Sequence, residues 1–257
     1  MTEEKIENRL GPVLRVEPVR LGTIATLDIE NMAAAGARVA EHERALAAAG
    51  TNVVATVLGG SDEFFEWDHY PPGDVYDWYS HAQFYYHAHP PENRRDVVAD
   101  EHGHFHTFLR LRGMPTGVAP VADPGLQPPT DPGDVLTHFV AISMGRTSQA
   151  IRLFTTNRWV TGETWYAAED VIAMLPRFVI GRKHPNDHVN EWITAVLTLF
   201  RPDIERLLRR RDEVLGHRAA DRPGINVYED RSLEVASFTD VSVEERISAV
   251  AAELRAR

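Results

Sequence analysis

The order of hydrophobic and polar positions divides this chain into one early helix, a strand-rich part and a helix-rich part. Apolar side chains recur three and four residues apart, as on one face of a helix, in four stretches: 28–50, 184–200, 202–215 and 242–257. Asp28 is a candidate N-cap for the first stretch, and Gly50 stands where a left-handed residue commonly ends a helix. The pattern therefore predicts a helix over residues 28–50 and a mainly helical region over residues 166–257.

The residues between these helices show patterns typical of strands. Residues 51–60 are rich in β-branched side chains, which favours a buried strand or a short helix. Residues 137–145 and 150–160 are two further runs separated by a short turn, and they predict a β-hairpin. Together with two histidine-bearing runs, they predict a sheet over residues 51–165 that is antiparallel and strongly curved, in a barrel-like manner.

Proline and glycine mark the connections. Residues 1–27 hold short apolar pieces broken by prolines, which predicts an irregular arm. The prolines and glycine of residues 71–74 are a turn signal, and residues 112–134 are so rich in both that we expect a long loop, of the kind that often closes a site as a lid. We therefore predict one α+β domain over residues 1–257, with an N-terminal helix and C-terminal helices packed on the sheet.

The histidines are concentrated in one short stretch. Six of the 12 histidines fall within residues 81–108, and five of these form two runs in which successive histidines stand two residues apart. Residues two apart on a strand share a face, so each run points its rings to one side. The first run contributes His87 and His89, and the second contributes His102, His104 and His106. If the two runs pair as neighbouring antiparallel strands, opposite Cβ atoms lie about 4.5–5.5 Å apart, within reach of a shared ion.

A metal site is the hypothesis that this cluster favours, against two alternatives: a catalytic histidine pocket without metal, and a polar face without a role. A buried polar group without a partner costs about 1–3 kcal/mol, so several buried imidazoles need a common partner. We predict His87, His89, His104 and His106 as ligands, with His138 and Glu101 as the next candidates. Glu101 and Tyr85 are the candidate acid–base or hydrogen-bonding groups.

The donor types limit the metal. The chain has no cysteine, so only nitrogen and oxygen can bind an ion. Imidazole suits zinc, copper and iron, whereas calcium and magnesium prefer oxygen, which predicts Fe, Cu or Zn as cofactor. The run His87-Ala-His89-Pro-Pro-Glu92 resembles the first metal motif of cupins in its site architecture, although the glutamate of cupins stands further along. A strand-borne His-x-His pair with a third histidine from a neighbouring strand is similar to the zinc site of α-type carbonic anhydrases.

Three functions are consistent with such a site. The first is a non-heme iron or copper oxidoreductase acting on a small organic substrate, which the aromatic residues near the histidines favour. The second is a zinc-dependent hydrolase or lyase, and the third is a metal- or heme-binding protein without turnover. Arg158, Trp159 and Glu163 combine charge with a large ring and are the candidate substrate-binding residues.

Charge and hydropathy argue against a nucleic-acid-binding protein, a membrane-spanning protein and a secreted protein. The formal net charge of −11 disfavours nucleic acid as a partner, and the arginines around residues 206–211 stand among acids that balance them. No apolar run is long enough to span a membrane, and the mixed charges of the first residues are not typical of a secretory signal. The sequence thus predicts a cytoplasmic protein with a small-molecule substrate, and it leaves the oligomeric state open.

Overall fold

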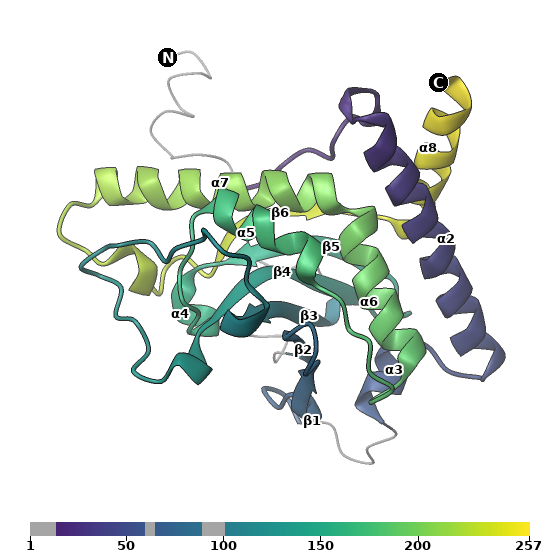
Figure 1. Ribbon diagram of the computed structural model, residues 1–257, viewed down its shortest axis with the longest axis horizontal. Coiled ribbons are helices and arrows are strands. Elements are labelled where there is room, and N and C mark those ends of the chain that lie inside the picture. Colours follow the sequence, from purple (N-terminus) through teal and green to yellow (C-terminus); the bar gives the residue numbers. More distant parts are fainter. Residues whose placement is uncertain (1–13, 60–64, 89–100) are drawn as a thin grey trace.

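A six-stranded antiparallel sheet forms the centre of the structure, a computed structural model that describes residues 14–59, 65–88 and 101–257 (Figure 1). The strands are β1 Tyr70–Tyr76, β2 Ala82–His87, β3 Glu101–Arg110, β4 Leu136–Gly145, β5 Ala150–Thr156 and β6 Val235–Asp240. They lie side by side in the order of the sequence, from β1 at one edge to β6 at the other. The predicted antiparallel sheet in a mixed helix and sheet fold is confirmed. The sheet is not closed, however, and the barrel-like curvature is not confirmed.

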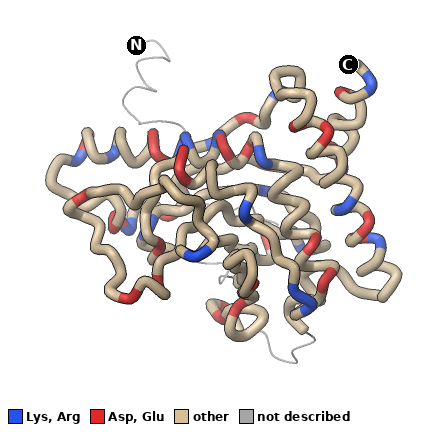
Figure 2. The backbone as a smooth tube through the Cα atoms, viewed as in Figure 1, with Lys and Arg blue, Asp and Glu red and all other residues tan. Residues whose placement is uncertain are grey.

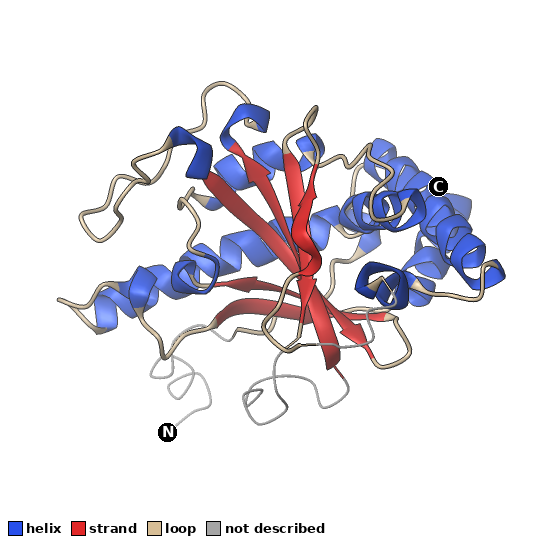
Figure 3. Cartoon of the chain, turned by 90° about the horizontal axis from the view of Figure 1, so that it is seen from below, coloured by secondary structure: helices blue, strands red, loops and turns tan. Residues whose placement is uncertain are grey.

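The helices lie around this sheet. They are α2 Thr26–Ala48, α3 Val53–Leu58, α4 Arg158–Thr161, α5 Ala168–Met174, α6 Asp187–Leu199, α7 Arg201–Asp221 and α8 Val243–Ala256. Short 3-10 turns occur at Leu21–Thr23, Leu111–Gly113, Pro132–Asp134, Leu175–Arg177 and Val227–Glu229. Helices α6 and α7 pack against the sheet, α2 packs on α6, and α8 packs on α2, so the helices form a layer on the sheet and a second layer beyond it (Figures 1 and 3).

One face of the sheet forms the hydrophobic core with these helices. Phe84 of β2 and Phe105 of β3 are fully buried, and their rings contact each other edge to face. The ring of Phe105 also contacts Trp192 of α6, whose indole is fully buried. At the other side of the same face, Ser237 of β6 donates a hydrogen bond to the carbonyl of Leu207 in α7. This apolar face therefore fixes the sheet against the helix layer.

Helix α2 lies within two residues of the bounds that the helical pattern predicts at each end. It begins at Thr26 and not at Asp28, which lies in the first turn, where a negative side chain suits the positive end of the helix dipole. It ends at Ala48, and Gly50 has the left-handed φ of 73° that was expected at this position. The arginines of α7 also behave as predicted, because Arg209 and Arg210 pair with acidic neighbours along a mixed-charge helix (Figure 2).

Two elements differ from the sequence-based prediction. The residues of the turn signal Pro71–Asp74 lie within β1, at an edge of the sheet, where proline is tolerated because half of the backbone groups need no partner strand. The register between β1 and β2 shifts after Tyr70, so the proline and glycine residues form a bulge in this strand. Strand β6 lies in the region predicted as mainly helical, and residues 53–58 form the helical alternative of the 51–60 prediction.

The loop over residues 112–134 follows the prediction in having little regular structure. Apart from the short turns at its two ends, it is irregular, and the backbone N–H of Val121 donates to the carbonyl of Trp165. Pro120 forms an isolated bridge with Tyr166, so the loop lies along the segment that follows α4. Among the described residues, no helix has both the length and the apolar character needed to cross a membrane.

Candidate metal centre

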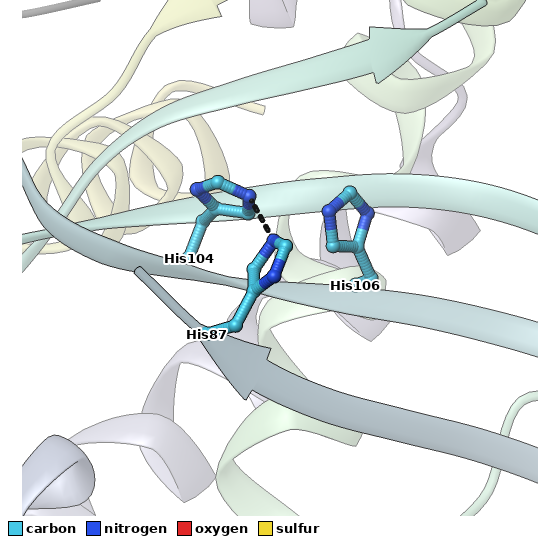
Figure 4. A group of neighbouring side chains, drawn as sticks. All are labelled: His87, His104 and His106. Carbon is cyan, nitrogen blue, oxygen red and sulfur yellow. Dashed lines mark hydrogen bonds between the residues drawn. The ribbon is translucent and has the colours of Figure 1, made fainter. Parts of the chain in front are cut away.

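The pairing of β2 with β3 brings three histidines together on the face of the sheet opposite the apolar core. In the register of these strands, His87 stands opposite His104, and Tyr85 stands opposite His106. All three imidazoles are buried, with 1–8% of each residue exposed. Their ring centroids lie 4.6 Å apart for His87 and His104, 5.1 Å for His87 and His106, and 4.8 Å for His104 and His106. Figure 4 shows the three rings side by side above the two strands.

Gly103, between the histidines of β3, allows this close pairing. A Cβ atom at this position would lie 2.5 Å from the carbonyl oxygen of His87 and 2.5 Å from the hydroxyl of Tyr86. No side chain fits there without moving backbone, so the glycine lets Tyr86 cross over β3 while His104 approaches His87. The glycine of the His102-Gly103-His104 sequence thus allows β2 and β3 to pair closely beside the histidines.

The three imidazoles can hold one metal ion. One nitrogen from each ring can be chosen so that all three lie within 4.8 Å of one another. Nε2 of His87 and Nε2 of His104 are 2.8 Å apart, facing each other (Figure 4). Zinc bound tetrahedrally by imidazole at about 2.0–2.1 Å separates its ligand nitrogens by about 3.3 Å, so His87 and His104 would move slightly apart and any pair near the 4.8 Å limit would move closer. The donor set and spacing fit a transition metal.

Two further side chains fix the orientation of the rings. Nδ1 of His104 lies 2.7 Å from Oε1 of buried Glu101, and since a carboxylate only accepts, the proton of a neutral His104 resides on Nδ1 and Nε2 is left with a lone pair. Nδ1 of His106 lies 3.0 Å from Nε2 of His138, which leaves Nε2 of His106 for a ligand. Glu101 and His138 therefore lie behind the three histidines, each bonded to one of them, in the arrangement that metal-binding histidines commonly have.

His138 belongs to a deeply buried group. Burial lowers its pKa to about 3, so this imidazole is neutral near pH 7 and can share a proton with His106 without adding charge. Glu163 accepts hydrogen bonds from the backbone N–H of His138 at 2.7 Å and from the hydroxyl of Thr137 at 3.1 Å. Burial raises the pKa of Glu163 to about 7. The candidate substrate residue Glu163 is thus placed as a support for the strand that bears His138.

Aromatic rings surround the imidazoles. Phe154 of β5 contacts His104 edge to face at 5.1 Å between centroids, and Tyr85 contacts His106 at 5.2 Å and Phe108 at 5.6 Å. Burial raises the pKa of Tyr85 above its usual value, so the phenol stays protonated and can donate a hydrogen bond. The site is therefore a polar cluster within an apolar wall, where electrostatic interactions are stronger than in water.

A residue pair that the sequence-based prediction did not include lies next to Tyr85. The imidazole of His69 stacks on the Tyr85 ring with centroids 3.6 Å apart, and its edge faces His87 at 5.9 Å. Nδ1 of His69 lies 2.9 Å from Oδ1 of Asp74, in the β1 bulge, where Gly73 and Asp74 have left-handed φ of 81° and 59°. The five-residue separation of His69 and Asp74 gave no signal, because a regular strand places odd spacings on opposite faces and only a bulge reverses this.

Some predicted site residues lie elsewhere. The register of β3 shifts between Glu101 and Gly103, and His102 hydrogen bonds at 2.6 Å to the hydroxyl of Tyr86, so the expectation that it shares the cluster is wrong. Arg158 pairs with Glu229 and lines a separate cavity of about 300 Å³ beside the 120–128 loop segment. Trp159 donates to the carbonyl of Leu233. His89 and Glu92 lie outside the described residues.

Comparison with known proteins gives a family and no activity. No curated protein matches the chain, and no solved structure matches it. The sequence model of one family matches residues 33–241, a range that includes all six strands and the three clustered histidines. This match covers well over half of the chain, and the chain therefore belongs to the family described as a domain of unknown function, DUF6969.

Proposed function

We propose that this protein is a metal-dependent enzyme whose His87, His104 and His106 bind one transition metal ion. The observation that carries the proposal is the convergence of three buried imidazoles, each of the two on β3 oriented by a buried partner, Glu101 or His138. A structural zinc site usually has four protein ligands, whereas three ligands leave a coordination position for substrate or water. Supporting groups of this kind typically strengthen metal binding 10–100-fold.

Zinc-dependent hydrolysis or hydration of a small molecule is the chemistry that this donor set supports best. Three imidazoles without a carboxylate are a ligand set of catalytic zinc, whereas non-heme iron oxygenases typically use two histidines and a carboxylate. Among the described residues, Glu101 is the candidate for a carboxylate ligand. Its Oε1 instead binds Nδ1 of His104, on the far side of that ring from Nε2. When bound, zinc supplies a Lewis acid that lowers the pKa of water toward about 7.

Oxidative chemistry with iron or copper is the second candidate function. The observation in its favour is the aromatic surround, since Tyr85, Phe108 and Phe154 contact the imidazoles and would keep water from a reactive centre. Copper accepts all-imidazole ligation, so the donor set permits this alternative. A metal-binding protein without turnover would use the same ligands and would differ only in its lack of catalysis.

The protein's own residues have distinct roles in the proposed reaction. Glu101 holds His104 in the tautomer whose Nε2 can bind, and neutral His138 does the same for His106. Tyr85 keeps its proton and donates a hydrogen bond to a substrate oxygen near His106, in a setting where burial strengthens that bond. The wall of phenylalanines excludes water from the polar cluster.

The proposal is tested by removing bound metal with a chelator and restoring zinc, iron(II) or copper separately. Hydrolysis of 4-nitrophenyl acetate and oxygen consumption with small phenols are then measured for the wild type, His104→Ala and the same-strand control His102→Ala. We expect zinc to restore hydrolysis in the wild type and in His102→Ala, with at least a hundredfold lower rate in His104→Ala, as is typical when a catalytic group is lost.

Each other outcome has a defined meaning. Oxygen consumption restored by iron or copper would establish the second candidate in place of the first. One metal per chain with neither rate would identify a binding protein without turnover. Equal rates in His104→Ala and the wild type would contradict the assignment of the centre. The variant His89→Ala, measured alongside for metal content, decides whether this predicted ligand contributes.

A further inference from the structure

A cavity of about 750 Å³ opens where β2 begins and β3 ends, at the opposite end of these strands from Glu101. It is lined by two arginines, two aromatic residues, two acids and the segment before β4, namely Gly73, Asp74, Tyr76, Trp78, Gln83, Arg110, Leu111, Arg112, Asp131, Pro132 and Gly133. This volume lies in the range of pockets that enclose small organic ligands. None of the three clustered histidines, nor Glu101, His138 or Tyr85, lines it.

The two arginines of this cavity have N–H groups without protein partners. Arg110 donates from Nε to Oε1 of Gln83 at 2.6 Å and from Nη1 to the carbonyl of Gly133 at 2.7 Å, which fixes its guanidinium and leaves Nη2. Within the described chain, Arg112 forms neither a hydrogen bond nor an ion pair, and no carboxylate pairs with Arg110. A guanidinium fork with free donors is suited to a carboxylate.

The acids of the cavity accept hydrogen bonds from neighbouring residues. Asp74 uses Oδ1 for His69 and Oδ2 to accept from Nε2 of Gln83 at 2.6 Å. Asp131 uses Oδ1 to accept from the backbone N–H of Gly133 at 2.7 Å. Both oxygens of Asp74 and one of Asp131 therefore have neighbouring partners, whereas the guanidinium N–H groups of Arg112 and Nη2 of Arg110 are open to a ligand that accepts hydrogen bonds, such as a carboxylate.

An aromatic wall completes the cavity. Trp78 is 73% exposed, an unusual degree for a tryptophan, and its ring stands edge-on to Tyr76 with centroids 4.7 Å apart. The edge contact holds the indole while leaving ring surface accessible, which favours stacking with a flat apolar group. The guanidinium of Arg110 lies 5.9 Å from the Tyr76 ring centroid, so the cationic and aromatic parts are adjacent.

The cavity also lies along the same strand face as the metal centre. Gln83, Tyr85 and His87 alternate on β2 and therefore share one face. At about 3.3–3.4 Å per residue, the Cα atoms of Gln83 and His87 are about 13 Å apart. The chain of contacts from Arg110 through Gln83 and Asp74 to His69, which stacks on Tyr85, covers this distance. The side chains of Gln83, Asp74 and His69 thus connect the cavity to Tyr85, next to the histidines.

We propose that this cavity binds small aromatic carboxylates, with Arg112 and Arg110 binding the carboxylate and Trp78 stacking on the ring. That such a ligand is the substrate rests on the proposed function, whereas its binding does not, because the cavity shares no residue with the metal ligands. The two parts can therefore fail separately.

The test is a titration of metal-free protein with 2-naphthoate, followed by calorimetry. We expect saturable binding that Arg112→Gln weakens about tenfold, the effect of losing one charged hydrogen-bonded contact. Arg146→Gln is the matched control, since Arg146 is exposed in the turn after β4, at the opposite end of the sheet. Trp78→Ala should weaken binding about fivefold, in line with the energy of an aromatic pair.

Two comparisons separate the parts of this inference. The neutral amide 2-naphthamide and the ringless anion acetate should each bind at least tenfold more weakly than 2-naphthoate, given the energies of a charged hydrogen bond and of ring burial. The variant His104→Ala should bind 2-naphthoate as the wild type does, which shows the site to be independent of the metal. Absence of saturable binding up to millimolar 2-naphthoate, or equal affinity of Arg112→Gln and Arg146→Gln, would overturn the proposal.

Discussion

The two faces of the same strands differ in what their side chains do. On β2 and β3 the residues that face the helices include the apolar rings of Phe84 and Phe105, which contact each other, and Phe105 packs against Trp192. His87 of β2, and His104 and His106 on either side of Phe105 in β3, point to the opposite face and contact one another. Both sets are buried. The alternation shows that one pair of strands provides the stability of the fold on one side and a polar, reactive cluster on the other.

This division makes the two faces separable by substitution. Removing a ring from the helix-facing side creates a cavity in a close-packed core, which costs both the transfer free energy and the lost contacts. Removing an imidazole from the other side gives up less apolar burial and costs mainly the hydrogen bond to its buried partner, about 1–3 kcal/mol, so the free energy of unfolding changes less. Stability should therefore report on the first face, and metal binding on the second.

The largest expected effect concerns the helix-facing side. Phe105→Ala should lower the free energy of unfolding by about 3–5 kcal/mol, because a fully buried ring is lost between Phe84, Tyr86 and Trp192. His106→Ala should cost less than half as much in metal-free protein. Urea denaturation of both variants provides the measurement. Equal losses for the two variants would show that the faces are not distinct in the way that the packing indicates.

The next effect concerns the pH dependence of stability on the histidine side. The pKa of Glu163 is raised from 4.5 to about 7 in the folded protein, so the folded state binds its proton more tightly than the unfolded state does. The stability from this group is present below pH 4.5 and is lost as the pH rises through 7. Wild type should thus lose on the order of 3 kcal/mol relative to Glu163→Gln over this interval.

Glutamine is a suitable replacement because it can still accept from the N–H of His138. His138, with its pKa lowered to about 3, acts in the opposite sense, gaining stability as the pH rises from 3 to 6.5. That contribution is common to both proteins and cancels in their difference. The comparison is made by urea denaturation at intervals between pH 4.5 and 8. A constant difference across this range would mean that Glu163 does not titrate there.

A smaller effect is expected for the support of His104. Glu101→Gln keeps the size of the side chain but removes the charge that holds the Nδ1 proton of His104. Metal affinity should fall 10–100-fold, the range for loss of a supporting carboxylate. The measurement is competition with a chromophoric chelator, and unfolding by urea checks that the metal-free variant is as stable as the wild type. An affinity equal to that of the wild type would exclude a role for this contact in binding.

The parts of this site that were predicted from sequence depend on strand periodicity. Two histidines two residues apart share a face of any regular strand, so the convergence of His104 and His106 with His87 follows from the pattern and from the pairing of adjacent strands. His102 breaks the pattern because the register shifts beside it, and a one-residue bulge has no reliable signature in hydrophobicity.

Other features depended on contacts between distant segments. The sequence indicated His138 as a site residue but not that it binds His106, since this is set by the position of β4. The contact of Glu101 with His104 lies within β3, where the register shift after Glu101 alters the regular alternation of faces. Strand β6 is six residues long and follows a helical region, so its assignment depends on pairing with β5, which is more than seventy residues earlier. The sequence-based prediction missed β1 because the prolines and glycine of this strand are typical of a turn.

The central claim is that His87, His104 and His106 bind one metal ion, and anomalous X-ray diffraction at the absorption edge of the bound metal tests it most directly. The account predicts one strong anomalous peak, with the Nε2 atoms of all three histidines at about 2.0–2.1 Å for zinc. A peak bound by other residues, or no peak between these rings in crystals soaked with zinc, iron or copper, would contradict it.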